Sequence, residues 1–297
     1  MPISPVFSLA LAPIFPYISI PPLQWGPFTI HPFGVLVAIA LFVGMYFVQR
    51  RGEELGLNPL TVSNLVTVTV IAIFLGSHWF EILAYQPERV LQDPWVLLRI
   101  WDGIASFGGL LGLLAAAVWF AARQKLPFLV STDVLLYGGV HAWIFGRLGC
   151  TVAHDHPGRF TDSWFSVRWP VNDPDQILNI AHLPGRFDLG LFEFLYTFVM
   201  LGIVYFTHRR WSWRPGFTTG VIFVSYAPVR FLFDFLRVID KRYLYLTPAQ
   251  WGSIALLATG IWLLYGYGRK KDGAEVFSAE ASEKNFSDNF DNNESAT

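Results

Sequence analysis

The sequence contains few charged residues, and this scarcity excludes an ordinary soluble surface. Charged residues make up 14% of the 297 residues, whereas hydrophobic residues make up 53% and aromatic residues 17%. Soluble globular domains usually carry about 25% charged residues. The composition therefore predicts a protein that lies in a lipid bilayer.

The chain also lacks cysteine pairs and an excess of positive charge. Cys150 is the only cysteine, which excludes an internal disulfide and a metal site built from several cysteines. It is either a small packing residue or a thiol of unknown reactivity. The formal net charge is −1, and a nucleic-acid-binding protein needs a concentrated basic face. We expect no nucleic-acid partner.

Apolar stretches long enough to cross a membrane recur along the chain. A transmembrane helix needs about 20 apolar residues to span roughly 30 Å of hydrocarbon. Seven stretches reach about this length: 31–49, 62–84, 103–122, 129–150, 188–207, 217–237 and 249–268. The sequence predicts an all-α polytopic membrane protein with about seven transmembrane helices, which form a single domain over residues 1–268.

Basic residues predict the orientation, because short cytoplasmic loops are enriched in Arg and Lys. The residues that follow odd-numbered spans are Arg50, Arg51, Arg123, Lys125, Arg209, Arg210, Arg214, Arg269, Lys270 and Lys271. On the other side, basic residues are spread over longer segments that also hold many acids. We expect the amino terminus outside and the carboxyl terminus in the cytoplasm.

Two segments differ from the spans. Residues 151–187 form one long connection that holds four prolines and the aromatic residues Trp164, Phe165 and Trp169. Long loops are usually functional or disordered, and the aromatic content favours a small ordered cap on the outer face. Residues 269–297 are rich in Asp, Glu, Asn and Ser, which predicts a disordered cytoplasmic tail.

Arg147 and Arg230 each lie inside an apolar span. A guanidinium in hydrocarbon costs several kcal/mol, so it persists where it faces protein, water or an anion. Asp234 and Arg237 follow Arg230 at helical spacing, which places the acid between two bases on one stripe. The stripe is either a self-neutralising ion network or part of a buried anion site, and a phospholipid phosphate suits such a site.

Three further polar residues lie inside spans. His78 and Glu81 are three residues apart in the second span, close enough on one helical face to form a structural pair. Glu193 lies in the fifth span. For each of them, a structural and a catalytic role both stay open.

Several motifs occur in a fixed order along the chain. They are Trp101-Asp102-Gly103, Ser106-Phe107-Gly108-Gly109-Leu110-Leu111-Gly112, Phe145-Gly146-Arg147-Leu148-Gly149-Cys150, and Ser225-Tyr226 followed by Arg230, Asp234, Phe235, Leu236, Arg237 and Asp240. From about Ile30 to Tyr267, their order and spacing resemble the prolipoprotein diacylglyceryl transferases of bacteria.

The resemblance implies an enzyme of the bacterial inner membrane with an outer cap on the periplasmic side. Such an enzyme moves the diacylglyceryl group of phosphatidylglycerol to the lipobox cysteine of a prolipoprotein signal peptide and forms a thioether. The resemblance implies that Arg147 and Arg230 are the catalytic arginines. It implies substrate binding by the residues at other motif positions, namely Tyr226, Asp234, Arg237, Asp155, Gly108, Gly109 and Glu193.

Departures from the family pattern leave the base that deprotonates the thiol unassigned. Phe107 stands where many members have a histidine before Gly-Gly-Leu, and a phenylalanine cannot take a proton. Cys150 replaces a frequent asparagine, and His78 replaces an arginine. His154 and His156 are unexpected histidines in the outer segment, and either has a side chain suited to act as a base.

We expect no metal and no other cofactor. His154, Asp155 and His156 are adjacent, so they cannot all point inward from one loop strand, and no fourth ligand is evident. Two functional interpretations stay open. The chain is either an active transferase, for this acceptor or another one, or a catalytically inactive paralogue. Such a paralogue would bind anionic phospholipid or a partner protein.

Overall fold

A computed structural model describes residues 13–26, 28–100, 102–103, 106–124, 126–170, 185–211, 214–238 and 244–266. The α-helices are α1 (Pro32–Glu54), α2 (Pro59–Phe80), α3 (Pro87–Gln92), α4 (Ser106–Gln124), α5 (Phe128–Ala153), α6 (Leu189–Trp211), α7 (Phe217–Phe233) and α8 (Pro248–Ile261). The strands are β1 (Leu23–Trp25), β2 (Phe28–Ile30), β3 (Pro157–Thr161) and β4 (Gly185–Asp188). The expected tail at 269–297 lies outside the described residues.

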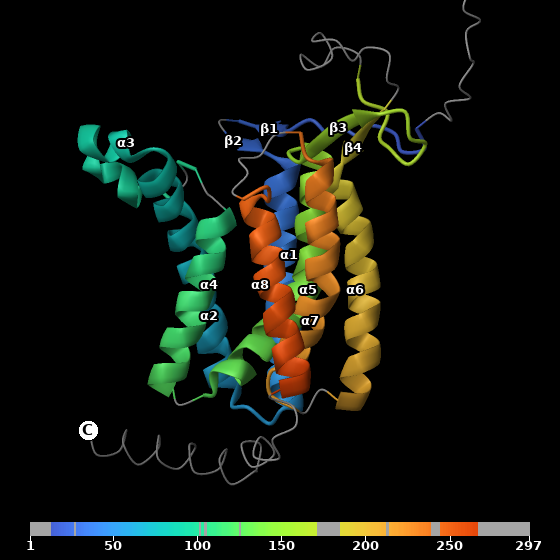
Figure 1. Cartoon of the computed structure of the whole chain (residues 1–297). Helices are drawn as coiled ribbons and strands as arrows, with labels where there is room; N and C mark the ends of the chain where they lie inside the picture. The colour runs from blue at the N-terminus through green and yellow to red at the C-terminus, as the bar shows by residue number, and fades with distance from the viewer. Residues whose placement is uncertain are drawn as a thin grey trace, which may run out of the picture. The chain divides into compact units, whose positions relative to one another are not determined.

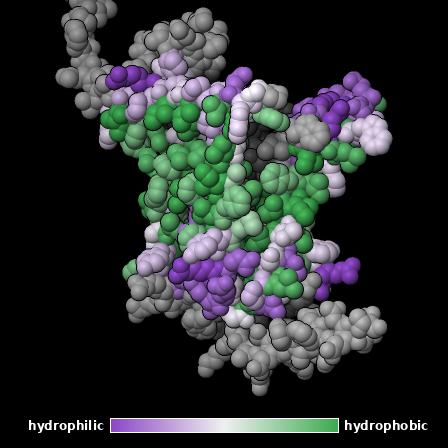
Figure 2. All heavy atoms as spheres, turned by 180° about the vertical axis from the view of Figure 1, so that it is seen from behind, coloured by the Kyte–Doolittle hydropathy of each residue, from purple (hydrophilic) through white to green (hydrophobic). Residues whose placement is uncertain are grey.

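The predicted all-α membrane class is confirmed. Within the described residues, five helices are long and apolar enough to cross a membrane: Pro32–Glu54, Pro59–Ala84, Phe128–Ala153, Leu189–His208 and Phe217–Leu236. The other two predicted spans coincide with shorter apolar helices, Leu111–Arg123 and Ala249–Tyr265. Figure 2 shows hydrophobic residues over the middle of the helices and hydrophilic residues near their ends.

The described part of the chain divides into two compact units. The described residues of one unit fall within Met1–Phe42, Val140–Tyr205 and Phe223–Thr259, and those of the other fall within Val43–Gly139, Phe206–Ile222 and Gly260–Thr297. In the first unit, the parts of α5, α6 and α7 that belong to it run side by side (Figure 1). The start of α6 is fixed locally, because Asp188 Oδ1 accepts a hydrogen bond from the backbone N–H of Leu191 at 3.1 Å.

The described residues of the segment 151–187 also belong to the first unit. Strands β3 and β4 pair in antiparallel fashion, with a register shift between Pro157 and Phe160. Arg186 of β4 lies against the rings of Phe160 and Trp169, at 4.6 and 5.0 Å from their centroids. Its Nε donates to the carbonyl oxygen of Gly158 at 2.7 Å. Strands β3 and β4, which we call the cap sheet, therefore pack around one buried arginine. That they form a cap on the outer face stays a prediction, and residues 171–184 lie outside the described residues.

In the second unit, α2 and α4 approach each other through glycines. A Cβ on Gly108 would lie 2.2 Å from the carbonyl oxygen of Gly76, and one on Gly112 would lie 2.1 Å from that of Ala72. Only residues without side chains permit this approach. The glycine-rich motif of the third predicted span thus forms a helix contact.

The expected pair of His78 and Glu81 is wrong. The ring nitrogens of His78 lie 3.0 Å from the carbonyl oxygen of Gly103 and 2.9 Å from that of Val96. Glu81 instead accepts a hydrogen bond from Gln86 at 2.8 Å. The helix changes to a π-helical turn over Glu81–Tyr85, so the regular spacing that motivated the pair ends at this point.

Candidate anion-binding site

Glu193 joins the two arginines of the first unit. Its Oε2 lies 2.7 Å from Nη2 of Arg147, and its Oε1 lies 3.5 Å from Nη1 of Arg230. The Glu193 side chain is only 2% exposed, whereas those of Arg147 and Arg230 are 14% and 18% exposed. One buried carboxylate from α6 therefore holds two guanidinium groups that come from α5 and α7.

Neighbouring side chains fix this arrangement. The hydroxyl of Tyr226 donates to Oε2 of Glu193 at 3.0 Å. Trp143 precedes Arg147 by one helical turn, and the guanidinium carbon lies 4.6 Å from the centre of its ring. The hydroxyl of Tyr196 donates to the backbone carbonyl of Ser225 at 2.5 Å, which ties α6 to α7 beside the site.

Asp234 forms a second acidic centre next to the first. Its Oδ1 faces Arg230 at 3.6 Å and Arg237 at 3.9 Å, so the predicted stripe of base, acid and base is confirmed. Its Oδ2 accepts a hydrogen bond from the hydroxyl of Thr247. The Asp234 side chain is fully buried, whereas that of Arg237 is 32% exposed. We call Arg147, Glu193, Arg230, Asp234 and Arg237 the arginine cluster.

Thr247 is held by the start of α8. Its backbone N–H donates to Oε1 of Gln250 at 3.0 Å, while the backbone N–H of Gln250 donates to Oγ1 of Thr247 at 3.1 Å. This reciprocal pair is a capping box. The spacing of Thr247 and Gln250 predicts such a cap, but no local pattern indicates that the same threonine reaches Asp234.

The arginines lie near the ends of their helices. Arg147 occupies the last two turns of α5, and Arg230 lies in the last turn of α7, which ends at Phe233. The predicted span of 217–237 placed Arg230 nearer the middle of its helix. Asp234 begins a short 3-10 turn instead, and Gly158 of β3 forms an isolated bridge with Arg237. The arginine cluster therefore borders the cap sheet.

The arginine cluster holds more basic than acidic side chains among the described residues. Three guanidinium groups face two carboxylates, so the cluster carries one net positive charge. A phosphodiester carries one negative charge and accepts paired hydrogen bonds from guanidinium groups. Among the described residues of the cluster, the basic groups therefore outnumber the acidic ones, which is compatible with binding of one such anion.

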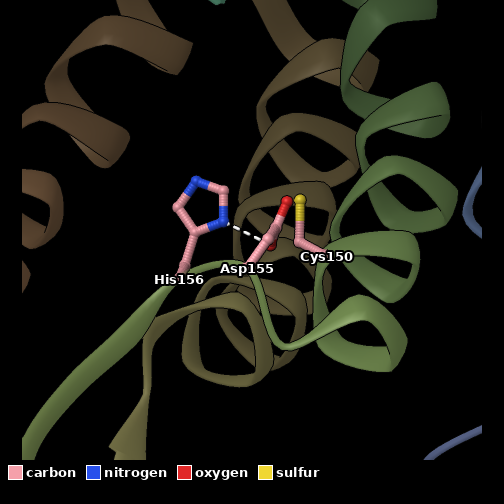
Figure 3. A group of neighbouring side chains, drawn as sticks. All are labelled: Cys150, Asp155 and His156. Atoms are coloured by element: carbon pink, nitrogen blue, oxygen red, sulfur yellow. Dashed lines mark hydrogen bonds and ion pairs between the residues drawn. The ribbon is translucent and has the colours of Figure 1, made fainter. Parts of the chain in front are cut away.

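A second group of side chains adjoins Arg147. Nη1 of Arg147 lies 3.9 Å from the sulfur of Cys150. His156 Nδ1 lies 2.5 Å from Oδ1 of Asp155 (Figure 3). The hydrogen bond to Asp155 and a further one to Cys150 raise the pKa of His156 to about 9. Cys150, Asp155 and His156 offer three possible metal-ligand atoms within 4.8 Å of one another.

The structure separates the two histidines of this segment. His154 has a positive φ of 51°, and its Nδ1 lies 2.6 Å from Oδ2 of Asp188 while Nε2 lies 3.1 Å from the carbonyl oxygen of Ile18. Its ring also stacks on Tyr17. Both ring nitrogens of His154 are thus engaged with protein acceptors, whereas His156 lies beside Cys150.

The sequence-predicted residues fall into three groups. Tyr226, Glu193, Asp234 and Arg237 join Arg147 and Arg230 in or against the arginine cluster. Asp155 belongs to the adjoining group. Gly108 and Gly109 lie in the contact of α2 and α4, where a Cβ on Gly109 would lie 2.7 Å from Oγ of Ser77. Their role in substrate binding stays a prediction.

The helices and this site define a polytopic membrane protein with a buried cationic site at the ends of its helices. The family model for prolipoprotein diacylglyceryl transferase matches residues 22–266. The chain therefore belongs to the prolipoprotein diacylglyceryl transferase family.

Relatives named phosphatidylglycerol–prolipoprotein diacylglyceryl transferase match most of the chain. The relative from Chromohalobacter salexigens is 31% identical over 248 residues, which cover 80% of this chain and 88% of the relative. The relative from Polynucleobacter asymbioticus is 29% identical over 252 residues, which cover 82% and 93%. The relative from Rhizobium leguminosarum bv. trifolii is 28% identical over 268 residues, which cover 86% and 93%.

Proposed function

We propose that this chain transfers the diacylglyceryl group of phosphatidylglycerol to the lipobox cysteine of prolipoproteins. The observation that carries the proposal is the arginine cluster, in which Arg147 and Arg230 share one buried carboxylate, Glu193. The names of the relatives support the same substrates.

The reaction increases the negative charge on the phosphate. The acceptor sulfur attacks the glycerol carbon that bears the phosphate ester, and the carbon–oxygen bond breaks with its electron pair on oxygen. A phosphodiester with one negative charge thus becomes glycerol phosphate with up to two. Guanidinium groups that bind this oxygen stabilise the transition state more than the ground state, which is the condition for catalysis.

Glu193 gives the site two states. Without lipid, its carboxylate is the shared partner of Arg147 and Arg230, and Asp234 also faces Arg230. When phosphatidylglycerol binds, its phosphate shares these groups with Glu193. Tyr226 and Asp234 keep Glu193 and Arg230 in position through the contacts described above.

The proposal includes the location and topology. The chain would lie in the bacterial inner membrane, with the amino terminus outside and the carboxyl terminus in the cytoplasm. The distribution of basic residues in short loops supports this orientation. The cap sheet and the adjoining arginine cluster would then face the periplasm, where the signal peptide presents its cysteine.

A transfer assay tests the proposal. Purified protein is mixed with phosphatidylglycerol-containing micelles and a lipobox peptide, and mass spectrometry follows the cysteine adduct. We expect Arg147→Ala to reduce transfer about 100- to 1,000-fold, because it removes a group that stabilises the departing phosphate. Arg159→Ala is the matched control, since Arg159 is an exposed arginine of β3.

Two results would contradict the proposal. Full transfer by Arg147→Ala would show that the arginine cluster does not act on the phosphate. A wild-type protein that binds phosphatidylglycerol but yields no peptide adduct would favour the lipid-binding paralogue.

A further inference from the structure

Cys150, Asp155 and His156 bring three different donor atoms together at the edge of the arginine cluster. Cys150 lies in the last turn of α5, and the other two lie in the connection to β3. The thiol sulfur, a carboxylate oxygen and an imidazole nitrogen are all within 4.8 Å of one another (Figure 3). We call these residues the thiol triad.

This donor set matches the ligand preferences of zinc. Zinc binds cysteine, histidine and carboxylate ligands at about 2.0–2.3 Å, and a zinc site with three protein ligands keeps a fourth position open. Ligand atoms of a tetrahedral site at those bond lengths lie roughly 3.3–3.8 Å apart. Nδ1 of His156 and Oδ1 of Asp155 lie 2.5 Å apart in a hydrogen bond, so zinc binding would displace the shared proton and separate these two atoms by roughly 1 Å.

The surroundings of the triad suit an open site. The side chains of Asp155 and His156 are 41% and 28% exposed, so a peptide can reach them. A zinc ion with one thiolate and one carboxylate carries no net charge. A second thiolate at the fourth position would add one negative charge, and the guanidinium of Arg147 lies 3.9 Å from the Cys150 sulfur to compensate it.

The position of His154 explains why the sequence alone did not indicate this site. The three consecutive residues His154, Asp155 and His156 cannot converge, and the structure directs His154 to Asp188 and Ile18. Cys150 is the third residue of the triad instead of His154, because the connection that follows α5 brings Asp155 and His156 close to the last turn of that helix. One proposed ligand therefore lies in a helix and the other two lie in the connection that follows it.

The geometry points to a zinc site formed by Cys150, Asp155 and His156, whose open position binds the acceptor thiol of the proposed transfer. This second part rests on the proposed function. A thiol that coordinates a metal ion loses its proton, here to water. The bound sulfur then attacks the glycerol carbon of phosphatidylglycerol, a carbon–sulfur bond forms, and the carbon–oxygen bond breaks with its electron pair on glycerol phosphate.

This arrangement would remove the need for a protein base. Phe107 cannot take a proton, and among the described histidines of this segment only His156 adjoins Arg147 through Cys150. In a zinc site, the metal ion rather than a histidine makes the thiolate available. Because the sulfur of Cys150 lies 3.9 Å from Nη1 of Arg147, an acceptor thiolate bound to the same ion would lie near the arginine that is proposed to hold the departing phosphate.

Metal binding is measured first and without the transfer reaction. The purified full-length protein is stripped with a chelator and titrated with Zn²⁺, and separately with Co²⁺, whose absorption reports thiolate coordination. We expect one ion per chain and a sulfur-to-cobalt charge-transfer band. Cys150→Asn should weaken binding by about 100-fold or more, since loss of even an outer contact to a metal ligand costs 10- to 100-fold.

Control variants separate this site from accidental binding. His31 and Asp162 are exposed residues outside the triad, so His31→Gln and Asp162→Asn should bind one ion with unchanged affinity. His156→Gln provides a second triad variant if Cys150→Asn does not fold. No ion bound by the wild type, or equal affinity in a folded triad variant, would overturn the site.

The transfer assay then separates the zinc site from the proposed function. Activity that falls on chelation and returns with Zn²⁺ supports both. Activity that survives chelation but disappears in Arg147→Ala overturns the zinc-bound thiol and leaves the transferase intact. Zinc bound by a protein that transfers nothing overturns the proposed function and thiol activation, but supports the metal site.

Discussion

The arginine cluster of α5, α6 and α7 and the glycine contact of α2 and α4 depart in opposite ways from an ordinary apolar membrane helix. The first places charges in an apolar setting, where Glu193 compensates Arg147 and Arg230. The second removes side chains, so that Gly108 and Gly112 lie against the backbone of α2. A compensating charge can be replaced by that of a ligand, whereas a backbone contact has no substitute.

Glu193→Gln is the strongest test of this difference. It leaves two partly buried guanidinium groups without their shared carboxylate, and breaking a buried ion pair costs about 3–5 kcal/mol. We expect a large loss of thermal stability in neutral detergent. Added phosphatidylglycerol should restore more stability in this variant than in the wild type, because its phosphate replaces the missing charge.

Thermal unfolding with and without the lipid measures both effects. Glu53→Gln is the control, since Glu53 is an exposed acid near the end of α1. A Glu193→Gln protein as stable as the wild type, or one that phosphatidylglycerol does not stabilise further, would contradict charge replacement in the arginine cluster.

Gly112→Ala breaks the other side of the comparison. The new Cβ would lie 2.1 Å from the carbonyl oxygen of Ala72, so α2 and α4 must separate, at a cost of about 1–3 kcal/mol. We expect a lower unfolding temperature that phosphatidylglycerol does not restore beyond its effect on the wild type.

Gly139→Ala is the matched control for that substitution. Apart from its chain neighbours and the adjacent helix backbone, no atom of the described residues lies within 4 Å of a Cβ at this position of α5, and alanine is the better helix former. The control should be as stable as the wild type or more so. Equal unfolding temperatures for Gly112→Ala and Gly139→Ala would show that the close helix contact is not required.

Phe107→Ala should have the smallest effect on transfer. The side chain has no group that can take a proton, so its loss removes no base. We expect less than about a tenfold change in the rate, which corresponds to less than about 1.4 kcal/mol. The transfer assay measures it at equal amounts of folded protein, and a loss as large as that of Arg147→Ala would give Phe107 a role in the chemistry.

Local patterns predicted the helices and the stripe of Arg230, Asp234 and Arg237. The length of an apolar stretch and the helical spacing of charged residues both depend only on residues that are close in the sequence. They did not predict that Glu193 bridges Arg147 and Arg230. That contact joins three helices that are distant in the sequence. Its place inside an apolar span left a structural and a catalytic role of Glu193 open, and the resemblance to a family added it to the site residues.

The side-chain partners near the ends of α5 and α2 depend on the backbone conformation where each α-helix ends. The turn after α5 decides that His154 binds Asp188 while Cys150 joins His156. The π-helical turn at Glu81 ends the spacing that suggested a pair with His78. Helical periodicity holds only while the helix continues, so the sequence was least informative at these ends.

Equilibrium binding of short-chain phosphatidylglycerol to the purified protein tests the central claim, that the arginine cluster holds the lipid phosphate. The ligands are phosphatidylglycerol and the diacylglycerol with the same acyl chains, and the proteins are the wild type and Arg147→Ala/Arg230→Ala. Two charge-assisted contacts of about 1.5–3 kcal/mol each predict at least a 100-fold weaker affinity for phosphatidylglycerol in the variant and an unchanged affinity for diacylglycerol. Equal phosphatidylglycerol affinity in the two proteins would contradict the account.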